Sequence, residues 1–232
     1  MINGPDQTSG IRYDRVIDLG PLEPVRTGDV RDIYELADYP NSLLKTIRAE
    51  KVGDRGFFKG KHAIKNIRPE GCYQGFAREI REFLIQCRRL YPQSGFLLPF
   101  AHIHGMVQTT SGLGHLSEKI VGSDGMLAPT IAKLHASGEL RDRHRDALKT
   151  MFQRCRDLHV VLNDIHASNV VYTEERSGQP ECVCVDGFGE RVFLPIHRWS
   201  KTINDRKISS IERGAAEELA GMPAVQRWGD KR

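Results

Sequence analysis

Residues 158–190, LHVVLNDIHASNVVYTEERSGQPECVCVDGFGE, carry the pattern that decides the fold. Two short runs rich in β-branched and aromatic residues, 170–172 (VVY) and 182–185 (CVCV), flank a polar segment centred on Ser177-Gly178. Such runs on either side of a glycine-containing turn are typical of a β-hairpin. The stretch therefore predicts a hairpin that is entered through a polar loop.

The open end of this hairpin is expected to gather three oxygen-bearing side chains. If the turn lies at the middle of the polar segment, antiparallel pairing sets Val170 opposite Val185. Asn169 then lies beside Asp186, and Asp164 precedes both in the entering loop. Hard cations such as Mg²⁺ prefer oxygen ligands, with one or two from protein and the rest from water and phosphate. An ordinary surface hairpin with an Asx-rich entry loop is the alternative interpretation.

The order of these residues resembles a known catalytic core. Asp164-x-x-x-x-Asn169 followed by the DGFG sequence at 186–189 resembles the protein-kinase-like superfamily, where such a loop precedes a hairpin and a metal-binding Asp. More narrowly, NDIHASNVVY with VDGFGERVFLP is similar to the small bacterial kinase-like YrbL family of PhoP regulatory network proteins. The resemblance implies ATP and Mg²⁺ as cofactors. It makes Asp164 the group that orients the nucleophilic hydroxyl or accepts its proton, and Asn169 and Asp186 the Mg²⁺ ligands.

Two departures from the protein-kinase pattern stand beside this resemblance. Leu162-Asn163 occupies the place where His-Arg is usual, and an extra glycine, Gly187, follows Asp186. Only residues 187–232 remain after this point, and they contain no A-P-E triplet. A short large lobe is therefore expected, with a hydroxyl of a small molecule or lipid-linked sugar as the acceptor rather than a protein.

Strand-like runs separated by turns extend from Ile11 to Ile47 and predict an antiparallel meander. Lys45 lies inside the apolar run LLKTI, and the resemblance implies that its ammonium contacts the nucleotide phosphates. Apolar neighbours would keep the field of that ammonium undiluted. The turn at Gly28 would cover the phosphates, although it has a single glycine. Taken alone, Lys45 is more typical of an edge-strand lysine facing solvent, and Gly28 of a simple hairpin turn.

Residues 74–91 change to a helical period of apolar residues, which predicts an amphipathic helix. Its charged residues, including Glu79 and Glu82, are expected on or beside the polar side. The resemblance requires one helical glutamate that pairs with Lys45; Glu79 is the first choice and Glu82 the second. Alternatively, both glutamates are solvated or pair with neighbouring arginines along the helix.

The strand-like segments 96–100, 103–107 and 113–120 follow this helix. By the resemblance, Glu118 and Ile120 mark the hinge between two lobes, where backbone groups could bond an adenine. His102, His104 and His115 alternate on these strands and are expected to be surface or hydrogen-bonded histidines rather than metal ligands.

Composition limits the class of protein. The 232 residues are 39% hydrophobic and 28% charged with a net charge of +4, which is typical of a globular chain and does not by itself indicate a nucleic-acid partner. Five cysteines at irregular spacing suggest no disulfide framework, and Cys182 and Cys184 are expected as core thiols. No run approaches the length of a membrane span, and no signal peptide is seen, so a cytoplasmic location is expected.

Together these observations predict an α+β protein with a protein-kinase-like two-lobe fold. Residues 1–10 are expected to be a disordered lead-in, residues 11–119 an antiparallel-sheet small lobe with one helix, and residues 120–232 a short, mainly helical large lobe with the catalytic loop and metal-binding hairpin. The expected function is an ATP- and Mg²⁺-dependent phosphotransferase acting on a hydroxyl. The alternative is a catalytically weak or inactive kinase-like regulatory module (a pseudokinase) that acts through partner binding.

Overall fold

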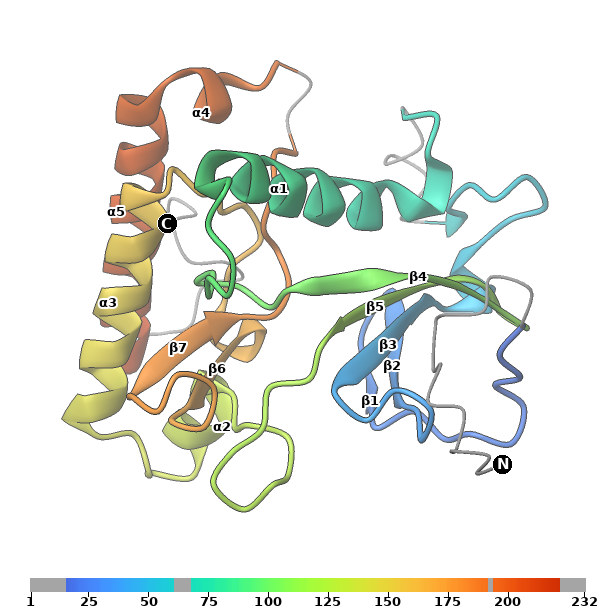
Figure 1. Ribbon diagram of the computed structural model, residues 1–232, viewed down its shortest axis with the longest axis horizontal. Helices are drawn as coiled ribbons and strands as arrows, with labels where there is room; N and C mark the ends of the chain where they lie inside the picture. The colour runs from blue at the N-terminus through green and yellow to red at the C-terminus, as the bar shows by residue number, and fades with distance from the viewer. Residues whose placement is uncertain (1–15, 61–67, 192–193, 222–232) are drawn as a thin grey trace, which may run out of the picture.

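The computed structural model describes residues 16–60, 68–191 and 194–221, which form a mixed α and β architecture (Figure 1). Its main sheet is antiparallel and five-stranded, with the order β1-β2-β3-β5-β4. The strands are β1 (Arg26–Thr27), β2 (Arg31–Glu35), β3 (Ser42–Ile47), β4 (Ile103–Thr109) and β5 (Gly112–Glu118). The expected antiparallel sheet is thus confirmed. The segment 1–10, the strand-like run 11–13 and the last residues from 226 lie outside the described ranges.

The helices cover one side of this sheet and the far end of the molecule (Figure 1). They are α1 (Gln74–Leu90), α2 (Ile131–Ala136), α3 (Asp142–Asp157), α4 (Ile196–Trp199) and α5 (Lys201–Leu219). Helix α1 runs along the sheet, and α3 lies beside α5. Within the described part of the chain, no helix is both long enough and apolar enough to cross a membrane.

The predicted hairpin is confirmed, but its register is one residue from the expected one. Strands β6 (Val170–Thr173) and β7 (Glu181–Cys184) pair with Val170 opposite Cys184, not Val185. The connection therefore spans residues 174–180 and is centred on Ser177. Within it, Arg176 turns inward and donates from Nε to the Glu118 carboxylate at 2.7 Å. A buried anchor inside the loop, rather than the polar composition alone, sets where the turn lies.

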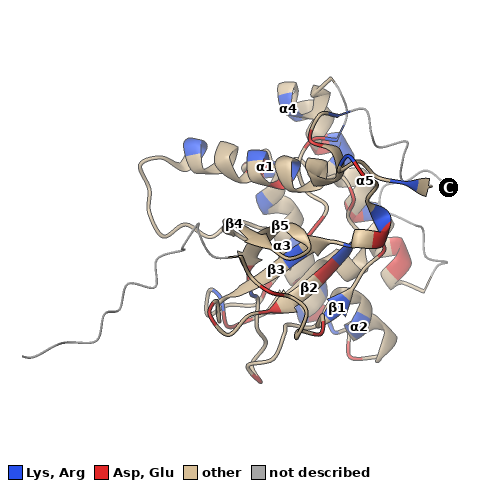
Figure 2. Ribbon diagram, turned by 90° about the vertical axis from the view of Figure 1, so that its right-hand side faces the viewer, with Lys and Arg blue, Asp and Glu red and all other residues tan. Residues whose placement is uncertain are grey.

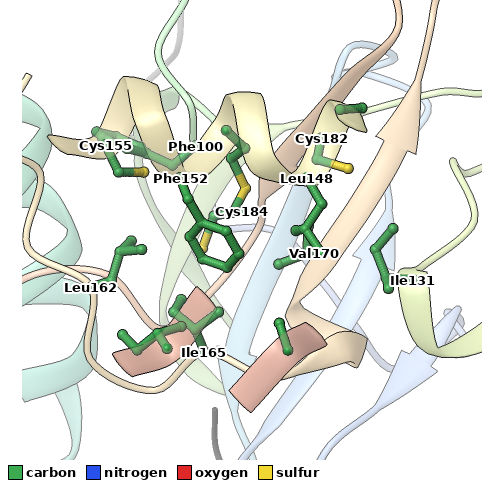
Figure 3. Packing of buried hydrophobic residues seen from close by; sticks show 14 of the residues in the cluster. Phe100, Ile131, Leu148, Phe152, Cys155, Leu162, Ile165, Val170, Cys182 and Cys184 are labelled. Atoms are coloured by element: carbon green, nitrogen blue, oxygen red, sulfur yellow. The ribbon is translucent and has the colours of Figure 1, made fainter. Parts of the chain in front are cut away.

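The largest hydrophobic core lies between this hairpin and helices α3 and α5 (Figure 3). Phe100 and Phe152 are fully buried there, and Cys182 and Cys184 face the same cluster. The interpretation of these two cysteines as core thiols is confirmed. Because this core backs β6 and β7, the open end of the hairpin is held on a rigid support.

Residues 96–100 do not form the predicted strand. Pro99 lacks an N–H and cannot continue a ladder, and the segment makes a single bridge, from Phe100 to Cys184. Two backbone hydrogen bonds flank that bridge: Cys184 N donates to Pro99 O at 3.0 Å, and Ala101 N donates to Cys184 O at 2.9 Å. The segment between α1 and β4 therefore joins the main sheet to the hairpin.

Helix α1 is formed as predicted, but its orientation corrects the expected one. Arginines recur along it (Figure 2), yet both Glu79 and Glu82 are buried, while Leu84 is 60% exposed. The glutamates face inward because cations on other elements receive them. Glu82 accepts from Arg198 and from Gln86 Nε2, the latter at 2.8 Å.

Candidate functional site

Lys45 lies on β3, between β2 and β5, and its residue is only 4% exposed. It is therefore a buried lysine of a central strand, not an edge lysine. Its Nζ donates to the carbonyl of Val185 at 2.6 Å and lies 4.0 Å from Glu79 Oε2. The side chain thus points from the sheet to the residue just before Asp186.

Glu79 is 1% exposed and is the glutamate that lies beside Lys45. Its Oε1 lies 2.8 Å from Arg31 NH2, and its Oε2 lies 3.6 Å from His115 Nδ1. Glu82, one helical turn further, faces Arg198 instead. The choice between the two glutamates is settled by which cation each one meets.

Arg31 is a residue of this site that the sequence pattern did not predict. It begins β2, and its NH1 lies 3.1 Å from Asp186 Oδ2, so the guanidinium bridges Glu79 and Asp186. The guanidinium also lies over the Phe76 ring, 5.0 Å from its centroid. A Cβ on Gly75 would lie 2.4 Å from Arg31 NH2. The glycine at the start of α1 is the one sequence signal that could have indicated a side chain approaching there.

Asp186 follows β7 and is held against the loop that carries Asp164. Its Oδ1 accepts from the Gly187 N–H at 2.6 Å. The Gly187 carbonyl in turn accepts from the backbone N–H groups of Asn163 and Asp164, both at 2.9 Å. Gly187 has φ +86°, and a Cβ there would lie 2.1 Å from the Asp164 carbonyl oxygen. The extra glycine after Asp186 is therefore the residue that permits the two segments to touch.

Asn169 also links the loop that carries Asp164 to the segment that ends in Asp186. Its Nδ2 donates to the Asp164 carbonyl at 3.1 Å, and its own carbonyl accepts from Val185 N at 2.8 Å. Asp164, Asn169 and Asp186 are thus brought to the open end of the hairpin, as the sequence predicts. In the described ranges no group of three or more His, Cys, Asp or Glu side chains could hold a metal ion.

The mutual interactions of the charged groups in this cluster shift the pKa values of Asp186, Glu79 and Arg31. Partial burial alone would raise the pKa of Asp186, but the Arg31 and Lys45 cations outweigh it and hold that pKa below its ordinary value. Burial raises the pKa of Glu79, against the opposing effect of Arg31. For Arg31, burial would lower the pKa, yet Asp186 and Glu79 raise it. Asp186 is therefore ionised and Arg31 protonated at neutral pH.

A comparison with known protein families identifies the family of this chain. The family described as PhoP regulatory network protein YrbL matches residues 17–213, which include every residue of this cluster. The chain belongs to the YrbL family. A comparison with curated proteins found no match.

The backbone groups of the predicted nucleotide-covering turn and hinge are hydrogen-bonded within the chain. Gly28 is exposed in a tight turn, where its N–H donates to Arg31 O at 2.8 Å. At the expected hinge, Glu118 N donates to His102 O at 2.8 Å, and Ile120 O accepts from Ala128 N at 3.0 Å. An adenine bound to the Glu118 N–H would have to displace the His102 carbonyl, whereas Ile120 O could accept a second hydrogen bond.

His115 also lies in the candidate site, and its environment differs from the prediction. It is fully buried between Phe76 and Glu79, and among the described residues neither ring nitrogen has a hydrogen-bond partner. It is thus neither a surface nor a hydrogen-bonded histidine. Burial, followed by the Lys45 and Arg31 charges, lowers its pKa to about 2 from 6.5. A neutral ring therefore lies against Glu79 at neutral pH.

We expect His115→Gln to flatten the dependence of stability on pH below about pH 6.5. The unfolded chain binds a proton on this histidine in that range, whereas the folded chain does not. The free energy of unfolding of the wild type therefore falls with decreasing pH, by up to about 1.4 kcal/mol per unit from this group. Urea denaturation at pH 7, 6 and 5 measures the slope.

His135→Gln is the matched control, because His135 is exposed on α2. It is expected to keep the wild-type slope. A His115→Gln slope equal to that of the wild type would show that His115 does not stay neutral in the fold.

Proposed function

We propose that this YrbL-family chain is a kinase-like, ATP- and Mg²⁺-dependent phosphotransferase with two lobes, which transfers a phosphoryl group to a hydroxyl. The observation that carries the proposal is the position of Lys45, whose buried ammonium reaches Val185 O at 2.6 Å and Glu79 at 4.0 Å. A fixed ammonium next to an ionised Asp186 suits the recognition of nucleotide phosphates, where positioning and charge neutralisation supply most of the catalysis.

The proposed acid–base role belongs to Asp164. The hydroxyl oxygen of the acceptor would bond to the terminal phosphorus, the bond from that phosphorus to the bridging oxygen of the nucleotide would break, and the hydroxyl proton would pass to an Asp164 carboxylate oxygen. The Asp164 backbone is fixed by the Gly187 carbonyl and by Asn169 Nδ2. Its carboxylate would thus be presented from a held loop.

Asn169 and Asp186 would hold Mg²⁺. Two oxygen-bearing side chains suit an ion that keeps several waters and is usually bound through one or two carboxylates plus phosphates. Asn169 Nδ2 is directed at Asp164 O, which orients the carboxamide, and Asp186 keeps 36% of its side-chain surface exposed. When bound, the ion would neutralise charge on the phosphates.

The proposed acceptor is a hydroxyl on a small molecule or a lipid-linked sugar. Nine residues separate Asp186 from Ile196, the first residue of α4. A connection this short leaves little chain for docking an extended peptide beside the site. Incubation with labelled ATP and fractions of a cell extract identifies the acceptor by the fraction that takes up label.

Asp186→Asn tests the nucleotide and metal assignment. At a hundred times its dissociation constant, Mg-ATP is expected to stabilise the wild type by about 2.7 kcal/mol, and Asp186→Asn should lose most of the Mg²⁺-dependent part. Thermal unfolding with ATP, with and without Mg²⁺, measures this. Asp157→Asn, an exposed change at the end of α3, is the control and should behave as the wild type. Equal Mg-ATP stabilisation of Asp186→Asn and the wild type would refute the assignment.

The second candidate is a regulatory module of the same fold that does not transfer phosphate. It is favoured by the Arg31–Asp186 ion pair at 3.1 Å, which engages the proposed metal ligand. In that case ATP would not stabilise the wild type with or without Mg²⁺, and no fraction would take up label.

A further inference from the structure

We propose that Arg31 is a resident counter-cation that a divalent metal must displace from Asp186, so that Arg31 sets the metal affinity of the site. The inference rests on the proposed function, because it assumes that Asp186 is a metal ligand. Arg31 has no counterpart in the sequence predictions, and its role follows from three observations.

The first observation is that the guanidinium bridges two carboxylates from different elements. Arg31 NH2 lies 2.8 Å from Glu79 on α1, and NH1 lies 3.1 Å from Asp186 after β7. A planar guanidinium can serve two carboxylates at once with separate N–H groups, which a lysine ammonium on a flexible stem does less well. The bridge therefore depends on arginine in particular.

The second observation is that the surroundings are shaped for this side chain. Gly75 leaves the space that Arg31 NH2 occupies, since any Cβ there would lie 2.4 Å from it. The Phe76 ring packs against the guanidinium at 5.0 Å, and the Arg31 backbone is fixed in register with Ile47 of β3. The cation is thus held in place from three sides.

The third observation is the unequal access to the two carboxylates. The side chain of Glu79 is 1% exposed, whereas that of Asp186 is 36% exposed. Both Asp186 oxygens already have partners, Arg31 for Oδ2 and the Gly187 N–H for Oδ1. An incoming ion can therefore reach Asp186 from solvent, and at Oδ2 it competes with the Arg31 guanidinium for the same oxygen. Arg31 can give up Asp186 and keep Glu79, so the exchange breaks one ion pair and leaves the other.

The experiment measures Mn²⁺ binding to the full chain, without nucleotide, by the relaxation enhancement of water protons. Arg31→Gln removes the charge and is expected to bind Mn²⁺ about tenfold more tightly than the wild type, equivalent to about 1.4 kcal/mol. Arg31→Lys keeps the charge but loses the bridge and should gain a few-fold. The double variant with Asp186→Asn should lose the gain. Arg81→Gln, which removes the same charge from the exposed face of α1, should bind as the wild type.

The outcomes separate the inference from the proposed function. Equal Mn²⁺ affinity of Arg31→Gln and the wild type, with weaker binding in Asp186→Asn, would overturn the role of Arg31 and leave the metal assignment intact. If neither the wild type nor any variant binds Mn²⁺, the role of Arg31 is overturned, and the Mg-ATP stabilisation of the wild type decides the proposed function separately. If Arg31→Gln does not fold, as judged by circular dichroism, Arg31→Lys decides: wild-type affinity in that variant overturns the inference.

Discussion

Arg176→Met is expected to lower the free energy of unfolding by about 3–5 kcal/mol, the usual cost of removing one partner of a buried ion pair. The Arg176 side chain is 6% exposed. It donates hydrogen bonds to both carboxylate oxygens of Glu118, from Nε at 2.7 Å and from NH2 at 2.8 Å. NH1 also donates to the Leu98 carbonyl at 2.8 Å. Its loss would leave the Glu118 charge and a buried carbonyl without this partner. Urea denaturation measures the change.

Lys149→Met is the control for Arg176→Met. Lys149 and Asp146 are 68% and 70% exposed, and their pair spans 3.2 Å on the surface of α3. Such pairs contribute between zero and about 1 kcal/mol. If the two variants lost similar stability, the Arg176–Glu118 contact would not be an anchor of the fold.

Gly187→Ala should cost about 3 kcal/mol or more, and it should also weaken Mg-ATP binding if the proposed function holds. The positive φ of +86° disfavours any side chain by about 1–2 kcal/mol. The added Cβ would in addition lie 2.1 Å from the Asp164 carbonyl oxygen, so the Asp164 loop must move. A chain of this size loses roughly 2–4 °C in its melting temperature for each kcal/mol, which thermal unfolding detects.

Gly178→Ala provides the matched comparison for Gly187→Ala. Gly178 also has a positive φ, +71°, but nothing lies within 4 Å of a Cβ there. It should therefore show only the conformational cost of about 1–2 kcal/mol and leave ligand binding unchanged. Equal losses in the two variants would contradict the close approach of Gly187 to Asp164.

The sequence predicted the elements of the fold better than the way they meet. Alternating and helical periods located β3, α1 and both strands of the hairpin, because those periods follow from local geometry. The predicted hairpin register was wrong by one residue. Arg176, inside the turn, binds Glu118, which lies 58 positions away in the sequence. The buried face of α1 was misjudged because Glu79 and Glu82 resemble solvated residues until Arg31 and Arg198 are known to face them.

The same limit applies to the candidate site. The resemblance to the kinase-like pattern predicted that Lys45 pairs with a helical glutamate close to Asp186, with Glu79 as the first choice and Glu82 as the second. Arg31 and His115 had no such signal, since an arginine beginning a strand or a histidine on one is usually exposed or hydrogen-bonded. Their burial depends on the space left by Gly75 and on the packing of Phe76, which only tertiary structure determines.

The two hydrogen bonds on either side of the Phe100–Cys184 bridge have a consequence for how the protein unfolds. They tie the segment before β4 directly to β7, and Phe100 itself lies in the core shared with α3 and α5. Unfolding of the segment before β4 would remove Phe100 from the hairpin core, so we expect the sheet and the hairpin to unfold together. Denaturation should follow one concerted transition, and proteases should find no long-lived half-folded species to cut.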